Sequence, residues 1–143
     1  MARLEPRSWM EILPTDECWR LLAASPIGRI AMTGAGGPEI FPINIAVSGE
    51  SIVFRTDPGS KLDLLTADPR VAVEVDGIDL ERRDGWSVVV TGRVEELGGD
   101  DLLAAQDLGL QPWTIGDKAR WFRLVPLQVS GRGIGLRASR GDR

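Results

Sequence analysis

Short runs of alternating apolar and polar residues, separated by turn residues, make up most of the chain. Alternation of this kind, in runs rich in valine, isoleucine and phenylalanine, is typical of half-buried strands. The pattern predicts six strands, at residues 28–33, 39–47, 52–56, 70–76, 86–97 and 121–130. The connections leave almost no room for parallel crossovers. We therefore predict a mainly β fold, a six-stranded antiparallel barrel with short peripheral helices.

Three short helices are predicted between the strands. Thr15 is placed to cap the first helix, which ends at Ser25-Pro26 because proline disfavours helical backbone in the residue before it. Ser60 is placed to cap a second helix over residues 61–67, and a third covers residues 100–108. Each is too short to form a layer of its own.

The segment from Ser51 to Leu65 carries the clearest candidate chemistry. A strand ends with Arg55 and Thr56, Asp57-Pro58-Gly59 interrupts it, and a helix begins at Ser60 and Lys61. A helix N-terminus presents unpaired N–H groups, and these side chains add two positive charges and two hydroxyls. The arrangement predicts a phosphate-binding site, and a solvated turn is the alternative interpretation.

Two strands carry features that an ordinary barrel strand does not need. Pro42 interrupts the strand at residues 39–47, which indicates an edge or a bulge with free backbone groups. A planar heterocycle could use those groups together with the amide of Asn44, although a barrel-corner strand is the simpler interpretation. Val88, Val89 and Val90 are apolar without alternation, so we expect both faces of that strand to be covered.

The chain length of 143 residues fits a single domain spanning residues 1–143. Residues 1–14 mix prolines with charges, and we expect them to form an arm packed on the surface or on a second subunit. The glycine- and arginine-rich end, from Gly131 and in particular residues 133–143, is expected to be a flexible tail.

Composition excludes several classes of function. The net charge of −4 and the isoelectric point near 4.9 argue against broad binding to nucleic acid or an anionic membrane. Apolar runs stay well short of the roughly 18–20 residues that span a bilayer. The absence of histidine removes histidine-based triads, histidine metal sites and histidine-ligated haem, so no metal site is predicted. One cysteine, Cys18, suits a reducing compartment, so we expect a cytoplasmic protein.

The ordered set of motifs resembles the pyridoxamine 5′-phosphate oxidase-like, FMN-binding split-barrel superfamily, in its short bacterial branch. The matching segments are Ser25–Ala31, Gly37–Asn44, Phe54–Leu62, Val73–Asp76, Gly85–Arg93 and Val129–Arg132. They cover most of residues 20–132 in the order and spacing of that superfamily. The resemblance implies a six-stranded split barrel, a two-fold homodimer, and FMN bound in clefts between the subunits.

The resemblance also implies which residues contact the cofactor. Thr56, Ser60 and Lys61 match positions that hold the flavin phosphate, and Ser87 matches a polar flavin contact. The strand from Ile40 to Asn44 matches the one whose backbone lines the isoalloxazine ring. The predicted cofactor-binding residues are therefore Phe41, Pro42, Ile43, Asn44, Arg55, Thr56, Ser60, Lys61, Trp86 and Ser87. Arg55 is included for its charge and position, and at least one of Trp86, Trp113 and Trp121 is expected to stack on or border the ring.

The sequence departs from true pyridoxamine phosphate oxidases, which carry an arginine and histidine pattern near the C-terminus. Without histidine, vitamin B6 oxidation is not expected. The leading hypothesis is an FMN-dependent oxidoreductase acting on a small planar substrate. The alternatives are a non-catalytic flavin-binding or sensing module, and an F420-dependent reductase of the same fold. The missing histidine weakens a haem-binding interpretation, although another axial ligand is conceivable. No side chain is a convincing general acid or base, so no catalytic residue is assigned.

Overall fold

The computed structural model describes residues 3–4, 10–110 and 119–135, and these form eight strands and three helices. In chain order the elements are β1 (Arg3–Leu4), β2 (Met10–Ile12), α1 (Thr15–Ala23), β3 (Ile27–Gly34), β4 (Gly37–Ser48), β5 (Ser51–Thr56), α2 (Ser60–Ala67), β6 (Arg70–Asp79), β7 (Asp84–Glu96), α3 (Gly99–Gln106) and β8 (Arg120–Ile134).

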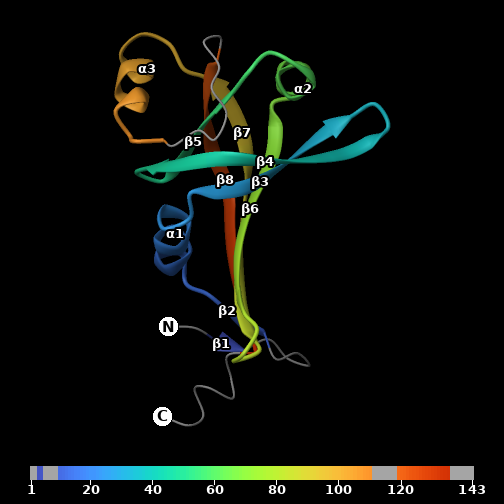
Figure 1. Cartoon of the computed structure of the whole chain (residues 1–143), viewed down its shortest axis with the longest axis vertical. Helices are drawn as coiled ribbons and strands as arrows, with labels where there is room; N and C mark the ends of the chain where they lie inside the picture. The colour runs from blue at the N-terminus through green and yellow to red at the C-terminus, as the bar shows by residue number, and fades with distance from the viewer. Residues whose placement is uncertain (1–2, 5–9, 111–118, 136–143) are drawn as a thin grey trace.

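All strands belong to one antiparallel sheet in the order β1-β2-β8-β5-β4-β3-β6-β7. Because β7 also pairs with β8, the six strands β3 to β8 close into a barrel, and β1 and β2 extend from its last strand (Figure 1). The helices lie around the outside of the barrel. The predicted mainly β class and six-stranded barrel are confirmed, with the two N-terminal strands as an addition.

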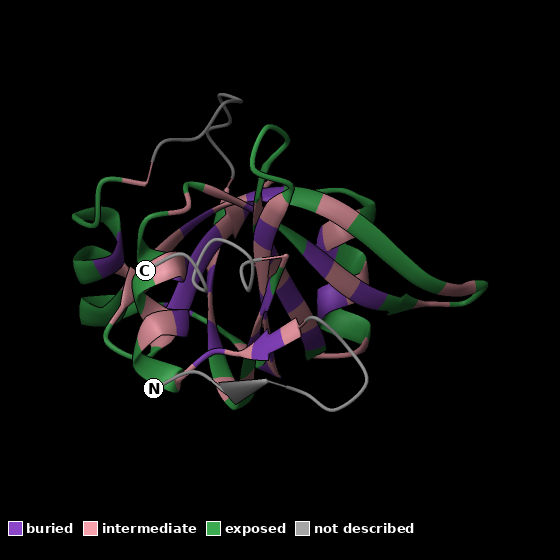
Figure 2. Ribbon diagram, turned by 90° about the horizontal axis from the view of Figure 1, so that it is seen from below, coloured by how far each residue is buried: buried purple, intermediate pink, exposed green. Residues whose placement is uncertain are grey.

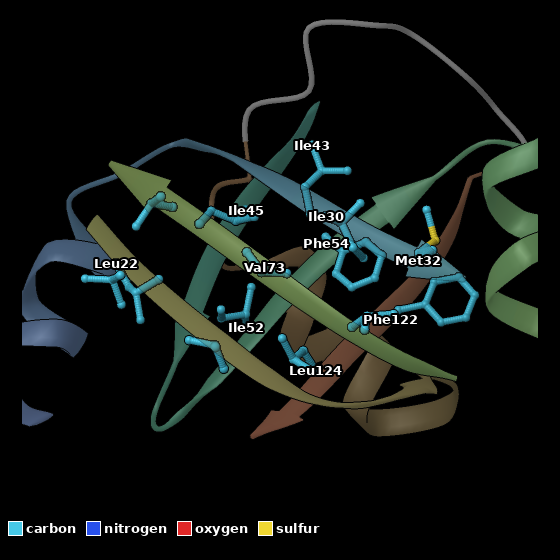
Figure 3. Close-up of a cluster of buried hydrophobic side chains, with 14 of the residues drawn as sticks. Leu22, Ile30, Met32, Ile43, Ile45, Ile52, Phe54, Val73, Phe122 and Leu124 are labelled. Carbon is cyan, nitrogen blue, oxygen red and sulfur yellow. The ribbon is translucent and has the colours of Figure 1, made fainter. Parts of the chain in front are cut away.

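The core fills the inside of the barrel, because alternate residues of each strand point inward. Ile52 and Phe54 of β5 face Leu124 and Phe122 of β8 in register, and the two phenylalanine rings stack with centroids 5.7 Å apart. Figure 3 shows these side chains converging with residues from β3, β4, β6 and α1. In Figure 2 the buried residues line the inner surface, while the tip of the β3–β4 hairpin projects from the barrel and is exposed.

A second apolar cluster explains why three consecutive residues of β5 are buried. Val53 points to the outer face, where it packs with Leu97 and with Ala105 of α3. Leu102 and Trp121 cover the same cluster. α3 therefore covers the outer face of β5, which explains why an apolar residue, Val53, stands on that face.

The helix starts differ from the predicted caps by one residue. α1 and α2 begin at Thr15 and Ser60, so the caps are Pro14 and Gly59, and neither makes a side-chain capping hydrogen bond. Gly59 has φ 151° and ψ −164°, a conformation that is rare for residues with a side chain. Since the turn needs glycine at the cap, Ser60 moves into the first helical position.

The last strand is longer than the alternation predicts. β8 continues to Ile134, where Gly133 pairs with Trp86 of β7 and with Glu11 of β2. Gly133 and Ile134, which were predicted to belong to the tail, are therefore part of a strand, because the N-terminal segment supplies a partner strand. Residues 136–143 lie outside the described residues. β6 and β7 also extend beyond the predicted strands at residues 70–76 and 86–97, since Asp79 pairs with Asp84 across a short turn.

Candidate functional site

The predicted phosphate site lies where β5 ends and α2 begins. Thr56 is buried, and its hydroxyl donates to the carbonyl oxygen of Asp57 over 3.3 Å. The first turn of α2 closes with the Asp63 N–H donating to the Gly59 carbonyl at 3.0 Å. The N–H groups that precede Asp63 in the helix have no partner within it, as at every helix start. Ser60 is exposed, and a Cβ placed on Gly59 would meet no atom within 4 Å. The helix start is therefore open to an approaching anion.

Lys61 connects this helix start to the strand predicted to line a ring. Its Nζ lies 5.8 Å from the centroid of the Phe41 ring, in cation–π contact. Phe41 is half-buried in β4 and pairs in register with Ile30 of β3. The contact between Lys61 and Phe41 thus joins the start of α2 to β4, although about 20 residues separate the two in the sequence.

The alternation of β4 sorts the predicted ring-binding residues onto two faces. Ile43 is buried in the barrel core, whereas Pro42 is exposed and Asn44 is half-buried on the outer face. Pro42 lies opposite Arg29 in β3. The Ile45 N–H donates to the Pro26 carbonyl, so every second residue back from Ile45 bonds to β3 and Pro42 falls between two of them. The missing N–H of Pro42 therefore removes no hydrogen bond between β3 and β4.

A hollow of about 270 Å³ adjoins this part of β4 on the outer face of the sheet. It is lined by Arg29, Ala31, Ile40, Ala72, Glu74 and Asp76. The Arg29 Nη1 donates to Glu74 at 2.9 Å and to Asp76 at 3.1 Å. Burial, followed by the hydrogen bond and charge of Asp76, raises the pKa of Glu74 against the opposing effect of Arg29. The hollow is lined by apolar and charged side chains together, and sequence reasoning missed it because its residues come from three strands.

The remaining predicted residues lie elsewhere. Arg55 pairs in register with Trp121, on the outer face that α3 covers. Trp86 packs against the barrel core, and Ser87 lies between Asp76 and Arg132. These two residues are near the end of β8 that pairs with β2, and Figure 1 shows α2 toward the opposite end of the molecule. Trp113 lies outside the described residues.

One chain therefore brings Phe41, which packs on the core side of β4, close to Lys61 at the start of α2, and keeps Trp86 and Ser87 apart from both. Sequence reasoning also missed Asp57, which it treated as a strand breaker. The Oδ1 atom of Asp57 is buried and has no hydrogen-bond partner. A carboxylate directly before a candidate phosphate site was a signal that could have drawn attention to it.

Comparison with known proteins places this chain in a family. The sequence model described as pyridoxamine 5′-phosphate oxidase matches residues 14–133. The chain belongs to the pyridoxamine 5′-phosphate oxidase family. The match includes every element from α1 to α3 and nearly all of β8, and the resemblance inferred from the motifs is confirmed.

Proteins with solved structures share the fold of this chain. An FAD-binding protein from Mycobacterium smegmatis is 39% identical, with a TM-score of 0.73 over 86% of this chain and 98% of that chain. An FAD-binding protein from Mesorhizobium loti is 32% identical, with a TM-score of 0.73 over 87% and 96% of the two chains. An uncharacterised protein of Mycobacterium tuberculosis is 38% identical over 118 residues, which is 78% of each chain.

The helices of the described part are all short. None of them has the length and apolar content needed to cross a bilayer.

Proposed function

We propose that this member of the pyridoxamine 5′-phosphate oxidase family binds a flavin through its FMN portion and acts as a flavin-dependent oxidoreductase. The observation that carries the proposal is the contact of Lys61 with Phe41, which joins the open start of α2 to β4. A phosphate donor set and a strand suited to a planar ring are thereby adjacent. FMN carries a phosphate and a planar ring in one molecule.

The residues at the start of α2 fit a phosphate. Lys61 would supply a cation, Ser60 a hydroxyl donor, and the first turn of α2 its unpaired N–H groups. β4 would present its backbone and the Asn44 amide to the edge of the ring. Flavins supply hydride-transfer chemistry, and the protein contributes binding, orientation and electrostatics.

The similarity to two FAD-binding proteins supports a flavin as the ligand class. FAD contains the FMN portion, but its phosphate is esterified on both sides and carries less charge. Titration of the apoprotein with FMN, FAD and F420 separates the possibilities. We expect FMN to bind most tightly, because Lys61 and the helix start meet its doubly charged phosphate. Tighter binding of F420 than of either flavin would overturn the proposal.

A homodimer with the cofactor cleft between subunits is the second part of the proposal. Trp86 and Ser87 lie far from α2 within one chain, so a site using both segments requires a second copy. Val89 is partly exposed on the outer face, while Val88 and Val90 are fully buried in the barrel. The same face carries the hollow beside β4, and a partner could cover both.

The oxidoreductase step is tested with the flavin-loaded protein. We expect NADH or NADPH to bleach the flavin absorption and an added acceptor to restore it. A flavin that binds tightly but is not reduced by either donor would instead favour the non-catalytic binding or sensing module. The substrate is proposed to be small and planar. Pyridoxamine phosphate is not proposed, because the chain has no histidine for the substrate-binding pattern.

A further inference from the structure

We propose that the hollow on the outer face of β3, β4 and β6 binds the imide edge of a planar heterocycle, which is a row of a carbonyl, an N–H and a second carbonyl. The ring of a flavin ends in such an edge, and this source of the edge rests on the flavin binding proposed above. A separate small planar substrate with the same edge is the other source. Arg29 and Ile40 line the hollow and are exposed, so a ligand can reach it.

The hollow exists because two small residues lie between longer ones. Ala31 pairs in register with Ala72 of β6 and with Ile40 of β4, and the neighbouring outward-facing row pairs Arg29 with Glu74. Each alanine adds only a methyl group to the outer face, so the longer side chains around the pair border a space of about 270 Å³. Ligand pockets usually measure roughly 300–1,000 Å³, so this space suits the end of a ring system better than a whole cofactor.

Arg29 has more hydrogen-bond donors than its partners in the protein require. Its Nη1 atom donates to Glu74 Oε1 at 2.9 Å and to Asp76 Oδ2 at 3.1 Å. A guanidinium carries five N–H groups, two of them on Nη1, so these two bonds do not use the N–H groups of Nε and Nη2. The Arg29 side chain is 55% exposed, and the two carboxylates hold it beside the hollow.

Glu74 and Asp76 place acceptors next to these donors. Each carboxylate uses one oxygen toward Arg29, and each has a second oxygen. Burial raises the pKa of Glu74, and the nearby Asp76 raises it further, against the opposing effect of Arg29. The repulsion between the two carboxylates is therefore only partly compensated. A ligand N–H that donates to either of them would reduce it.

The combination of charges selects the ligand. Two carboxylates face one guanidinium, so the hollow disfavours an anion. Arg29 already supplies the cation that bridges the carboxylates, which leaves donors and acceptors side by side. An imide edge is complementary to them, because its carbonyl accepts from Arg29 while its N–H donates to Glu74 or Asp76.

The hollow also adjoins the strand that is proposed to present its backbone to the flavin ring. Arg29 lies opposite Pro42 of β4. This pair falls between two hydrogen-bonded pairs, and in such positions the facing side chains are closest to each other. A ring seated against β4 would therefore bring its imide edge to Arg29.

The test compares FMN with 3-methyl-FMN, in which a methyl group replaces the imide hydrogen. Dissociation constants are measured for the wild-type apoprotein, for Arg29→Leu, and for a double variant that combines Glu74→Ala with Asp76→Ala. Arg20→Leu and Glu17→Ala are the matched controls, since these residues form a surface ion pair on α1, outside the hollow. Urea unfolding of each apoprotein is measured in parallel.

We expect the wild type to bind FMN roughly tenfold more tightly than 3-methyl-FMN, because the methyl group removes a hydrogen bond to a charged acceptor. The double variant should bind the two flavins within about twofold of each other, since that acceptor is gone. Arg29→Leu should weaken FMN binding by roughly tenfold, and the two controls should leave the preference for FMN unchanged.

Thymine separates the two sources of the edge, because it has the imide edge without the rest of the flavin. Its binding is measured by saturation-transfer NMR on the apoprotein and on the FMN-loaded protein. Thymine that binds the apoprotein and is excluded by FMN would identify the flavin ring as the occupant. Thymine that binds the FMN-loaded wild type but not the FMN-loaded double variant would identify a separate planar substrate.

A preference for FMN that survives in the double variant, together with thymine binding that the variant does not change or that is absent, would overturn the inference and leave flavin binding intact. A wild-type protein that binds no FMN would overturn the proposed function instead. In that case the loss of thymine binding in the double variant would still support the hollow as an imide site, and no thymine binding to the wild type would overturn that as well.

Discussion

Replacement of Lys61 by alanine is the perturbation that tests the phosphate site most directly. Lys61 is half-buried in the first turn of α2, and its ammonium lies 5.8 Å from the centroid of the Phe41 ring. The substitution removes a cation from the helix start without removing the helix, because alanine is the strongest helix former. Phosphate recognition and folding can therefore be separated.

The loss of FMN affinity and the loss of apoprotein stability should differ in size. A charge-assisted hydrogen bond to phosphate contributes about 1.5–3 kcal/mol, so FMN affinity should fall roughly ten- to hundredfold. The cation–π contact with Phe41 at a partly exposed site is worth about 0.5–1 kcal/mol, which sets the expected loss of apoprotein stability. Riboflavin lacks the phosphate, so the protein's affinity for it should fall by no more than the loss of the cation–π contact accounts for.

The assay is a pair of fluorescence titrations, with FMN and with riboflavin, on wild type, Lys61→Ala and Lys61→Arg. The arginine variant keeps the positive charge and should retain most of the preference for FMN over riboflavin. Equal losses for both ligands in Lys61→Ala would mean that Lys61 supports the fold. No loss for either ligand would mean that the start of α2 is a solvated turn.

Three further predictions concern the fold and the assembly. Gly131→Ala should destabilise the protein by about 1–3 kcal/mol in urea unfolding, because the added Cβ would lie 2.5 Å from the buried Cys18 Sγ. Gly36→Ala, whose Cβ would meet no atom within 4 Å, is the matched control and should change stability by less than about 0.5 kcal/mol. The side-chain and backbone hydrogen bonds from Arg70 lower the pKa of Asp68 from 3.8 to about 2. The stability that ionised Asp68 contributes is therefore complete above pH 3.8 and is lost as the pH falls through 2. Between those pH values the free energy of unfolding should fall less for Asp68→Asn than for the wild type. Equal falls for the two proteins would refute the assignment. Sedimentation at micromolar concentration should show a dimer, and a monomer that keeps its flavin would contradict the shared cleft.

The sequence by itself determined the fold class and the segment that carries the candidate phosphate site. Alternation along residues 70–76 predicts one of the barrel strands because one face of that strand is buried and the other is more exposed to water. The interruption at Asp57-Pro58-Gly59 marks the passage from β5 to α2, because proline and glycine act on the backbone locally. These signals depend on neighbouring residues, so they can be read without the tertiary structure.

The tertiary structure decided which of these segments meet. The contact of Lys61 with Phe41 follows from the packing of α2 against the β3–β4 hairpin, and no local pattern encodes it. The pairing of β2 with the end of β8 carries that strand through Gly133, although a stretch rich in glycine and arginine favours a flexible tail when read alone. The burial of the Asp57 Oδ1 atom is another feature that no local pattern encodes. Burial and hydrogen bonding depend on chain segments distant in sequence, and only the folded chain brings those segments together.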